Sequence, residues 1–363
     1  MLRLFIVLAI SSFLFISCGH HKSDKPVPTV HKGYNFKLKI PSEWIEKLRH
    51  YNYKQNNVKL LRELDSLIQP NKIFVPDEDE DLDTNRYILN PIFANLDGES
   101  ANELVCLVGW DETYPSITVF KEIKGDWYLL YVEPFYMFYT MPELIIANNF
   151  AKNKTFYTRQ LYDRGSGEFY DGYSFYKLVN NKVYKCLELP HEARIYGWGL
   201  YLNQEVTMDF NVNGGNTDEI WAYFHYNFFP GAINKGDMSW DGHTDISLVK
   251  GEDGINYQWD SVKFAYKPKD YKNGDSTMLN AQKVACFGAF GNDSLFVHAF
   301  HAEINKTLQT GTRQQKRILK DYLARVKQTG HATTEELEET TEAGGTKFYG
   351  VKKKKKIKSG KAE

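Results

Sequence analysis

Two histidines in the C-terminal third of the chain have a spacing that could hold a metal ion. His298 and His301 are three positions apart, and Glu303 follows them. On a helix the two imidazoles would share a face and could bind a transition metal with a third ligand such as His225 or His243. On a strand they would point to opposite faces, because side chains alternate with a period of two. The apolar residues around them favour a strand, so we predict two ordinary, partly buried histidines.

Tryptophans and carboxylates are a second source of chemistry. Tryptophan rings can stack on sugars, and nearby carboxylates such as Asp241 and Asp245 could then act on a glycosidic bond. A glycosidase needs two carboxyl groups at a set separation, which a sequence does not show. Core packing explains most such aromatic residues, and the sequence contains no Gly-x-Ser-x-Gly or His-Glu-x-x-His motif. The tryptophans concerned are Trp110, Trp127, Trp198, Trp221, Trp240 and Trp259.

A polar, glycine-centred turn that leads into an apolar strand occurs twice. The first copy covers residues 95–105 and the second covers residues 211–221. The two copies align without a gap, so that Glu103 matches Glu219. We interpret them as marks of a repeated β-unit. Asn, Asp and Gly also form tight turns without any ligand, through left-handed backbone conformations and side-chain caps.

A hairpin pattern is repeated as well. Residues 119–134 align without a gap with residues 175–190, and Lys121 then matches Lys177. Both copies have the same strand lengths around a central turn signal, which predicts a β-hairpin in each place. A less regular third hairpin is predicted over residues 246–264, with its turn at the glycines of the segment Gly-Glu-Asp-Gly.

The first turn, Asn-x-Asp-Gly-x-x-x-Asn-Glu-Leu, resembles the polar turn of integrin-alpha-type β-propeller repeats. A polar turn, a strand and a hairpin also follow one another in a propeller blade. The resemblance implies a mainly β fold of irregular, propeller-like repeated β-units, with a β-sandwich as the alternative. It also implies calcium as a cofactor, although the second copy has no central carboxylate and calcium prefers charged oxygen ligands. The implied ligands are Asn95, Asp97 and Glu103 in the first copy, and Asn211, Asn213 and Glu219 in the second.

The first residues have the pattern of an export signal that ends at a cysteine. Arg3 precedes an apolar run over residues 4–16, which is shorter than the roughly 20 residues that a membrane-spanning helix needs. The ending Phe-Ile-Ser-Cys18 resembles a bacterial lipoprotein lipobox, and the aromatic-rich chain resembles envelope lipoproteins of Bacteroidota. The resemblance implies that Cys18 carries the lipid and that the protein lies in the cell envelope, at the outer membrane or its periplasmic face. An unlipidated export signal is the alternative.

Composition and charge limit the remaining classes. Aromatic residues make up 15% of the chain, which is typical of β-rich proteins because these side chains suit pleated, half-buried surfaces. The net charge of −1 indicates no strongly charged partner, and export argues against nucleic acid. If Cys18 is acylated, an odd number of cysteines remains, and we interpret Cys106, Cys186 and Cys286 as buried apolar residues, with one disulfide left open.

These patterns divide the chain into six segments, with short helices at both ends of the β-rich body. The helical segments follow from apolar residues at helical spacing, and the tail follows from opposite charge blocks without apolar periodicity. The predicted segments are a signal peptide (1–17), a lipidated cysteine and tether (18–33), a helical segment (34–76), a β-rich repeated body (77–305) that ends in a strand pair over 280–301, a C-terminal helix (306–330) and a disordered charged tail (331–363).

The sequence therefore predicts a lipid-anchored envelope protein with a non-catalytic binding or scaffold role. Its expected partners are the membrane, through the lipid, and an envelope protein or a glycan. A surface or periplasmic hydrolase acting on glycans is the alternative.

Overall fold

The structure of the chain is a computed structural model. It describes residues 34–52, 58–68, 88–109, 116–135, 143–147, 152–165, 168–196, 201–212, 218–231, 246–269, 293–329, 336–341 and 347–352. The predicted signal peptide, Cys18 and the tether lie outside the described residues.

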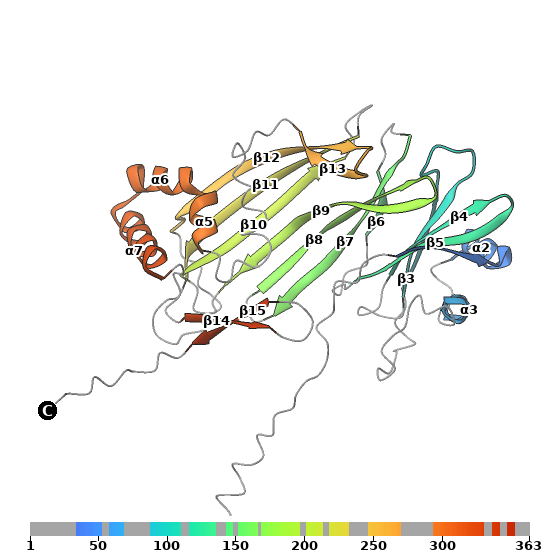
Figure 1. The fold of residues 1–363 in the computed structure, drawn as a ribbon, viewed down its shortest axis with the longest axis horizontal. Helices are drawn as coiled ribbons and strands as arrows, with labels where there is room; N and C mark the ends of the chain where they lie inside the picture. Colours follow the sequence, from blue (N-terminus) through green and yellow to red (C-terminus); the bar gives the residue numbers. More distant parts are fainter. Residues whose placement is uncertain are drawn as a thin grey trace, which may run out of the picture.

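Two large antiparallel sheets form most of the described chain, and neither closes into a barrel (Figure 1). The first sheet has five strands in the order β1-β5-β4-β3-β2. These are β1 (Tyr34–Ile40), β2 (Ile88–Ala94), β3 (Glu103–Gly109), β4 (Ser116–Ile123) and β5 (Asp126–Pro134). The mainly β fold predicted from the sequence is thus confirmed.

The second sheet has eight strands that neighbour one another in chain order, from β13 to β6. They are β6 (Leu144–Ile146), β7 (Thr155–Gly165), β8 (Glu168–Val179), β9 (Lys182–Ile195), β10 (Leu202–Asn211), β11 (Glu219–Pro230), β12 (Val249–Asp260) and β13 (Ala265–Pro268). Two large sheets of unequal size are not a ring of similar small ones. Propeller-like repeats are therefore not shown by the described strands.

The two repeated hairpins exist, but each belongs to a different sheet. One is β4–β5 and the other is β8–β9. Lys124 and Gly125 have φ angles of 56° and 83°, and Asn180 and Asn181 have φ angles of 52° and 61°. Positive φ at both central residues is the conformation of the tight two-residue turns that match the twist of a hairpin. The sequence repeat therefore marks a shared local structure, not a shared place in a repeated domain.

The third predicted hairpin is wrong. Residues 249–258 pair without interruption with β11 as part of β12, and the turn comes later, at residues 261–264. The glycine at the expected turn, Gly251, serves packing instead. A Cβ atom there would lie 2.4 Å from the hydroxyl oxygen of Tyr226.

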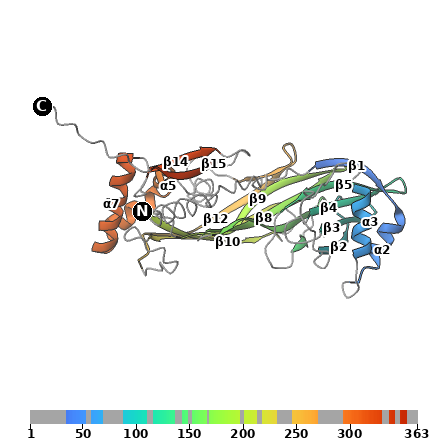
Figure 2. The ribbon, with the colours of Figure 1, turned by 90° about the horizontal axis from the view of Figure 1, so that it is seen from below.

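Helices cover the two sheets at opposite ends of the molecule (Figures 1 and 2). Helices α2 (Ser42–Arg49) and α3 (Val58–Ile68) bury apolar side chains such as Trp44 and Leu61 against the first sheet. Helices α5 (Asp293–Ala299), α6 (His301–Thr310) and α7 (Arg313–Thr329) pack Phe296, Phe300 and Tyr322 against the second. None of the described helices is long and apolar enough to span a membrane.

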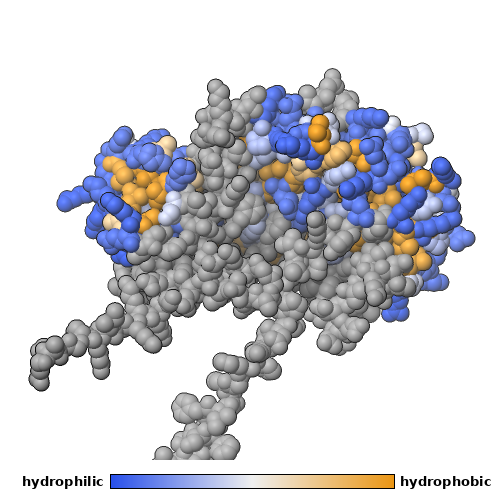
Figure 3. Space-filling model, viewed as in Figure 1, coloured by the Kyte–Doolittle hydropathy of each residue, from blue (hydrophilic) through white to orange (hydrophobic). Residues whose placement is uncertain are grey.

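Three apolar clusters hold these layers together. One lies between α2, α3 and the first sheet, and another joins the second sheet to α5–α7. The third lies between the two sheets and includes Tyr176 and Phe156, whose rings are stacked 5.4 Å apart. In the space-filling view, apolar atoms gather over the α5–α7 end (Figure 3), where Leu308, Ile318 and Leu323 are only partly buried.

The structure differs from the predicted segments at three places. The segment 34–76 begins with a strand, β1, which pairs with β5. The described part of the expected strand pair at 280–301, from residue 293 onward, is helical, and the C-terminal helical region is a set of three helices. Within the expected disordered tail, β14 (Glu336–Thr341) pairs with β15 (Lys347–Lys352).

Candidate functional site

The first polar turn does bring the predicted ligand residues together, around a lysine. Lys121, on β4, donates hydrogen bonds from Nζ to the carboxylates of Asp97 and Glu99. Its Nζ also lies 3.8 Å from Oε1 of Glu103. Lys121, Asp97 and Glu103 are all buried. A positive charge thus already stands beside the carboxylates of this turn.

Local hydrogen bonds fix the turn without any ion. The backbone N–H of Leu96 donates to Oε2 of Glu103 over 2.7 Å, and the N–H of Gly98 donates to Oδ1 of Asn95 over 2.7 Å. Gly98 has a φ of 77°, and a Cβ there would lie 2.7 Å from a side-chain atom of Lys152, so the position requires glycine. Calcium binding by Asn95, Asp97 and Glu103 stays a prediction, and it would require Lys121 to leave.

Electrostatics at this turn depend on burial. Burial raises the pKa of the Glu103 carboxyl, and the hydrogen bond from Leu96 opposes that rise. Burial lowers the pKa of the Lys121 ammonium, but the hydrogen bonds to Asp97 and Glu99 outweigh burial and the pKa is raised overall. The Lys121 ammonium therefore stays charged, and the charges form a structural network.

The second polar turn is built differently. Asn213 lies outside the described residues. Glu219 pairs with Lys269 over 3.2 Å, and its neighbour Asp218 accepts a 2.6 Å hydrogen bond from Nζ of Lys177. Asn211 lies at the exposed end of β10. The structure thus does not gather the three predicted ligands of this copy among the described residues.

Lys177 is the second buried cation, and it stands at the hairpin position that matches Lys121. Its side chain is 0% exposed. Besides Asp218, its Nζ donates to the carbonyl oxygen of Asn153 over 2.6 Å and lies over the rings of Trp259 and Tyr266 at 5.0 and 5.7 Å. Aromatic faces attract cations because of their negative quadrupole. The matching position of the two hairpins therefore holds a buried lysine in each, and the surroundings of the two lysines are unrelated.

His298 and His301 lie on helices and not on a strand, so the strand prediction is wrong. Both are exposed, His298 on α5 and His301 on α6, so the prediction that they are partly buried is wrong as well. His301 contacts the amide of Asn305, and the suggested third ligand His225 lies 3.3 Å from Glu252. Among the described residues, the one group of three or more side chains whose ligand atoms are close enough to hold a metal ion includes neither His298 nor His301. His243 lies outside the described residues.

That group consists of Asp171, His191 and Glu192, whose ligand atoms lie within 4.8 Å of one another. Asp171 is buried, and its carboxylate accepts hydrogen bonds from Arg159 and, over 3.0 Å, from the backbone N–H of Glu192. The same carboxylate lies 3.1 Å from Nδ1 of His191. Glu192 is paired with Arg194 over 2.6 Å. A guanidinium on each carboxylate fills the role that a metal would take, so this cluster serves strand pairing.

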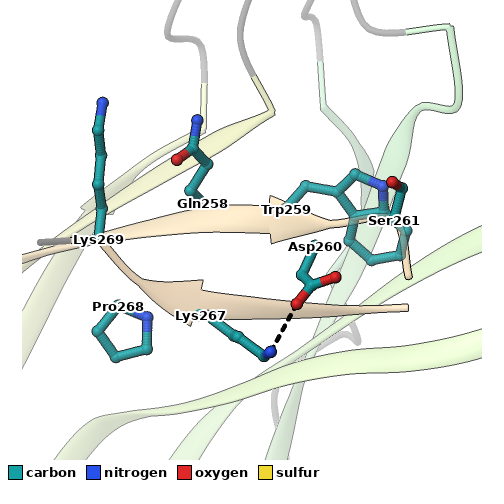
Figure 4. Close-up of a pocket in the computed structure, with 7 residues that line it drawn as sticks. All are labelled: Gln258, Trp259, Asp260, Ser261, Lys267, Pro268 and Lys269. Atoms are coloured by element: carbon teal, nitrogen blue, oxygen red, sulfur yellow. Dashed lines mark hydrogen bonds and ion pairs between the residues drawn. The ribbon is translucent and has the colours of Figure 1, made fainter. Parts of the chain in front are cut away.

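A depression lies where β12 and β13 meet, and Figure 4 shows the side chains that line it. Its volume is about 390 Å³. Lys267 and Asp260 form a 2.5 Å ion pair across it, and the hydrogen bond from Lys267 lowers the pKa of Asp260 to about 2. A carboxylate so held is a poor general acid or base near neutral pH. Its lining residues are Gln258, Trp259, Asp260, Ser261, Lys267, Pro268 and Lys269.

The outer face of strands β10–β12 is the most unusual surface. Along β11, buried and exposed residues alternate: Ile220, Ala222 and Phe224 are buried, whereas Trp221 and Tyr223 are exposed. The strand register places a row of polar residues beside these two rings. We call this surface the outer face, and its members are Thr207, Asp209, Asn211, Trp221, Tyr223, His225, Glu252, Gly254 and Asn256.

Of the tryptophans considered in the sequence, Trp221 alone is exposed among those described. Trp127 is buried at 4% exposure, and Trp259 is partly buried beside Lys177. Trp110, Trp198 and Trp240 lie outside the described residues, as do Asp241 and Asp245.

The cysteines support the sequence interpretation where they are described. Cys106 and Cys186 are both free and buried. Burial raises the pKa of the Cys186 thiol to about 12 and raises that of Cys106 as well, so neither is a reactive thiolate. Cys286 lies outside the described residues.

Comparison with known proteins identifies no family. No protein-family model matches the chain, and no curated protein or solved structure matches it.

Proposed function

We propose that the protein is anchored in the cell envelope by a lipid on Cys18 and that its β-rich body is a non-catalytic binding module. The anchor is supported by the apolar run that ends at the Phe-Ile-Ser-Cys18 sequence. Several acyl chains on one cysteine give a stable attachment, whereas one chain alone gives a reversible one.

The outer face of β10–β12 is the single observation that carries the binding role. It presents two large aromatic rings to solvent on a strand in the middle of a sheet. Polar residues of the two neighbouring strands flank these rings. Exposing aromatic area to water is unfavourable, and an exposed apolar patch bordered by polar residues is typical of a binding site.

Four carboxylates that lie in buried clusters or in the depression are poorly placed for catalysis. General acid and base catalysis needs a carboxyl that is free to exchange a proton. Asp97, Asp171 and Asp218 are each held by a cation, and Asp260 is paired across the open depression. The finer prediction of a propeller-like arrangement has no support in the strand order, so the binding role rests on the open sheet alone.

The anchor is tested by a Cys18→Ala variant. It should lose lipid labelling and move from the membrane fraction to the soluble fraction, while Ser23→Ala in the predicted tether should behave as the wild type. Retention of Cys18→Ala in the membrane fraction would show that the anchor assignment is wrong.

The non-catalytic role is tested by incubating the full-length protein with a panel of envelope and plant polysaccharides and measuring released reducing ends. We expect no release above that of a heat-denatured control. Release that requires the folded protein would support the alternative, a surface or periplasmic hydrolase acting on glycans.

A further inference from the structure

Trp221 and Tyr223 form a pair of nearly parallel rings on the outer face. Their centroids are 6.4 Å apart and their planes differ by 16°. The side chains are 38% and 47% exposed, and only two other large apolar residues among those described, Ile145 and Val262, are comparably exposed. Because β11 is flanked by β10 and β12, the ring pair cannot be explained as the frayed side of an edge strand. The rings are held in place by the sheet and are accessible.

Neighbouring strands leave these rings open. Tyr223 stands opposite Gly254 on β12, and a Cβ atom at Gly254 would lie 3.7 Å from a carbon of the Tyr223 ring. A larger side chain at this position would extend over the ring. On the other side Tyr223 faces Asp209 of β10, whose side chain is exposed. The residues on both sides of the Tyr223 ring are therefore small or polar and do not cover it.

Two hydrogen-bonding groups beside the rings have no partner within the described part of the chain. The indole N–H of Trp221 and the carboxylate of Asp209 make no hydrogen bond or ion pair with another described residue. Asn256, the cross-strand neighbour of Trp221, is buried at 7% exposure, and its amide donates a 3.5 Å hydrogen bond to Glu219. A ligand on this face would therefore find its hydrogen-bonding partners in Trp221 and Asp209.

This combination matches one class of ligand, a sugar. A pyranose ring has an apolar face of C–H groups that packs on an aromatic ring, and hydroxyl groups around its edge that both donate and accept hydrogen bonds. Trp and Tyr offer a rigid apolar surface with a polar group at the rim. The outer face supplies a donor and acceptors next to two such rings, which lie two positions apart on one strand with centroids 6.4 Å apart.

The charges on the outer face indicate which kind of polysaccharide it would bind. The outer face contains two carboxylates, Asp209 and Glu252, whereas lysines lie beyond its ends: Lys250 follows on β12, and Lys269 pairs with Glu219. The carboxylates beside the rings disfavour a sulfated, phosphorylated or uronate polymer at this position, because like charges repel at close range. A neutral polysaccharide incurs no such penalty.

We propose that the outer face of β10–β12 binds a neutral polysaccharide, with Trp221 and Tyr223 stacking on its sugar rings and with Asp209 and the indole N–H of Trp221 bonding to its hydroxyl groups. The proposal rests on the binding role proposed above and names its ligand class and site.

The test is affinity electrophoresis of the full-length protein in native gels that contain galactomannan, xyloglucan, mixed-linkage β-glucan or amylopectin, with polygalacturonate as the anionic comparison. At least one neutral polysaccharide should retard the wild type. Trp221→Ala and Tyr223→Ala should each weaken the retardation about tenfold, because each removes one stacking surface. Trp221→Phe should keep part of it, and the matched control Val262→Ala, at an exposed residue away from the outer face, should keep all of it.

Three results would overturn the proposal: no neutral polysaccharide retards the wild type, Trp221→Ala is retarded as strongly as the wild type, or polygalacturonate alone retards it. Circular dichroism of each variant shows that the fold is kept, and the more conservative Trp221→Phe covers a failure of Trp221→Ala to fold. If retardation is absent while Cys18-dependent membrane retention holds and no polysaccharide is cleaved, the glycan proposal fails and the anchored binding module survives.

Discussion

At the scale of single residues, the molecule supplies its own cations where a metal ion was expected. Lys121 reaches from β4 into the first polar turn, and Lys177 reaches from β8 to Asp218. Burying an ammonium is costly unless it is paired and hydrogen-bonded. Both lysines meet this condition, and each one also neutralises at least one acidic side chain that would otherwise stand alone.

Removing the charge of Lys121 should destabilise the protein strongly. In Lys121→Met, the buried carboxylates of Asp97 and Glu103 would lose their counter-charge, and we expect the free energy of unfolding in urea to fall by about 3–5 kcal/mol. The matched control is Lys39→Met, because the ion pair of Lys39 with Asp126 is exposed and should contribute little. Equal stability of the two variants would show that Lys121 does not compensate the buried carboxylates.

Glu103 should make stability depend on pH. Because burial raises its pKa above the ordinary value of 4.5, the folded state holds this proton more tightly than the unfolded state. The free energy of unfolding contributed by this group therefore falls as the pH rises from 4.5 through the raised pKa. Glu103→Gln cannot ionise, so its stability relative to the wild type should increase over this window. Urea unfolding between about pH 4 and pH 8 measures the difference, and a difference that stays constant with pH would contradict the prediction.

At the scale of elements, short-range patterns could be predicted and long-range ones could not. The repeated hairpins follow from turn residues and strand lengths that lie next to one another in the chain. The partners of their lysines do not, because Asp97 and Asp218 are 24 and 41 residues away. The uninterrupted strand β12 could not be predicted, because the segment Gly-Glu-Asp-Gly at 251–254 is typical of a turn. In the structure Gly251 instead leaves room for the side chain of Tyr226.

Two strands follow directly from the period of their residues. Residues 34–40 alternate between apolar and polar types, which is the period of a strand, and they form β1. In a strand over residues 219–228, the period of two places Trp221 and Tyr223 on one face. Their neighbours Asp209 and Asn256 become visible only through the strand register, which the sequence does not show.

The two tight hairpin turns should respond in opposite ways to exchange with glycine. Gly125→Ala should lower the free energy of unfolding by about 1–2 kcal/mol, because its φ of 83° is unfavourable for a residue with a Cβ. Nothing lies within 4 Å of such a Cβ, so the cost comes from the backbone alone. Asn181→Gly should be close to neutral or slightly stabilising, since it relieves the same kind of conformation at a φ of 61°. Urea unfolding of both variants checks this, and a destabilisation by Asn181→Gly as large as that by Gly125→Ala would contradict it.

At the scale of the whole molecule, the two sheets form one connected body with one sheet face left open. The apolar cluster between the sheets is supported at its rim by polar contacts. The side-chain amide of Asn35 on β1 exchanges two hydrogen bonds with the backbone of Val183 on β9, and Lys185 pairs with Glu133 over 2.7 Å. The helices α5–α7 pack on the side of β11 that carries Tyr226 and Phe228. Since side chains alternate along a strand, the outer face points away from these helices.

Covalent footprinting is the most direct test of this account. Full-length protein would be labelled by hydroxyl radicals with and without the neutral polysaccharide that retards it, and the labelling of each residue would be read by mass spectrometry. We expect Trp221 and Tyr223 to be protected, while the exposed Val262 and Ile145 are labelled equally in both samples. Unchanged labelling of Trp221 and Tyr223 in protein that has bound the polysaccharide would contradict the central claim that the open face of β10–β12 is the binding site.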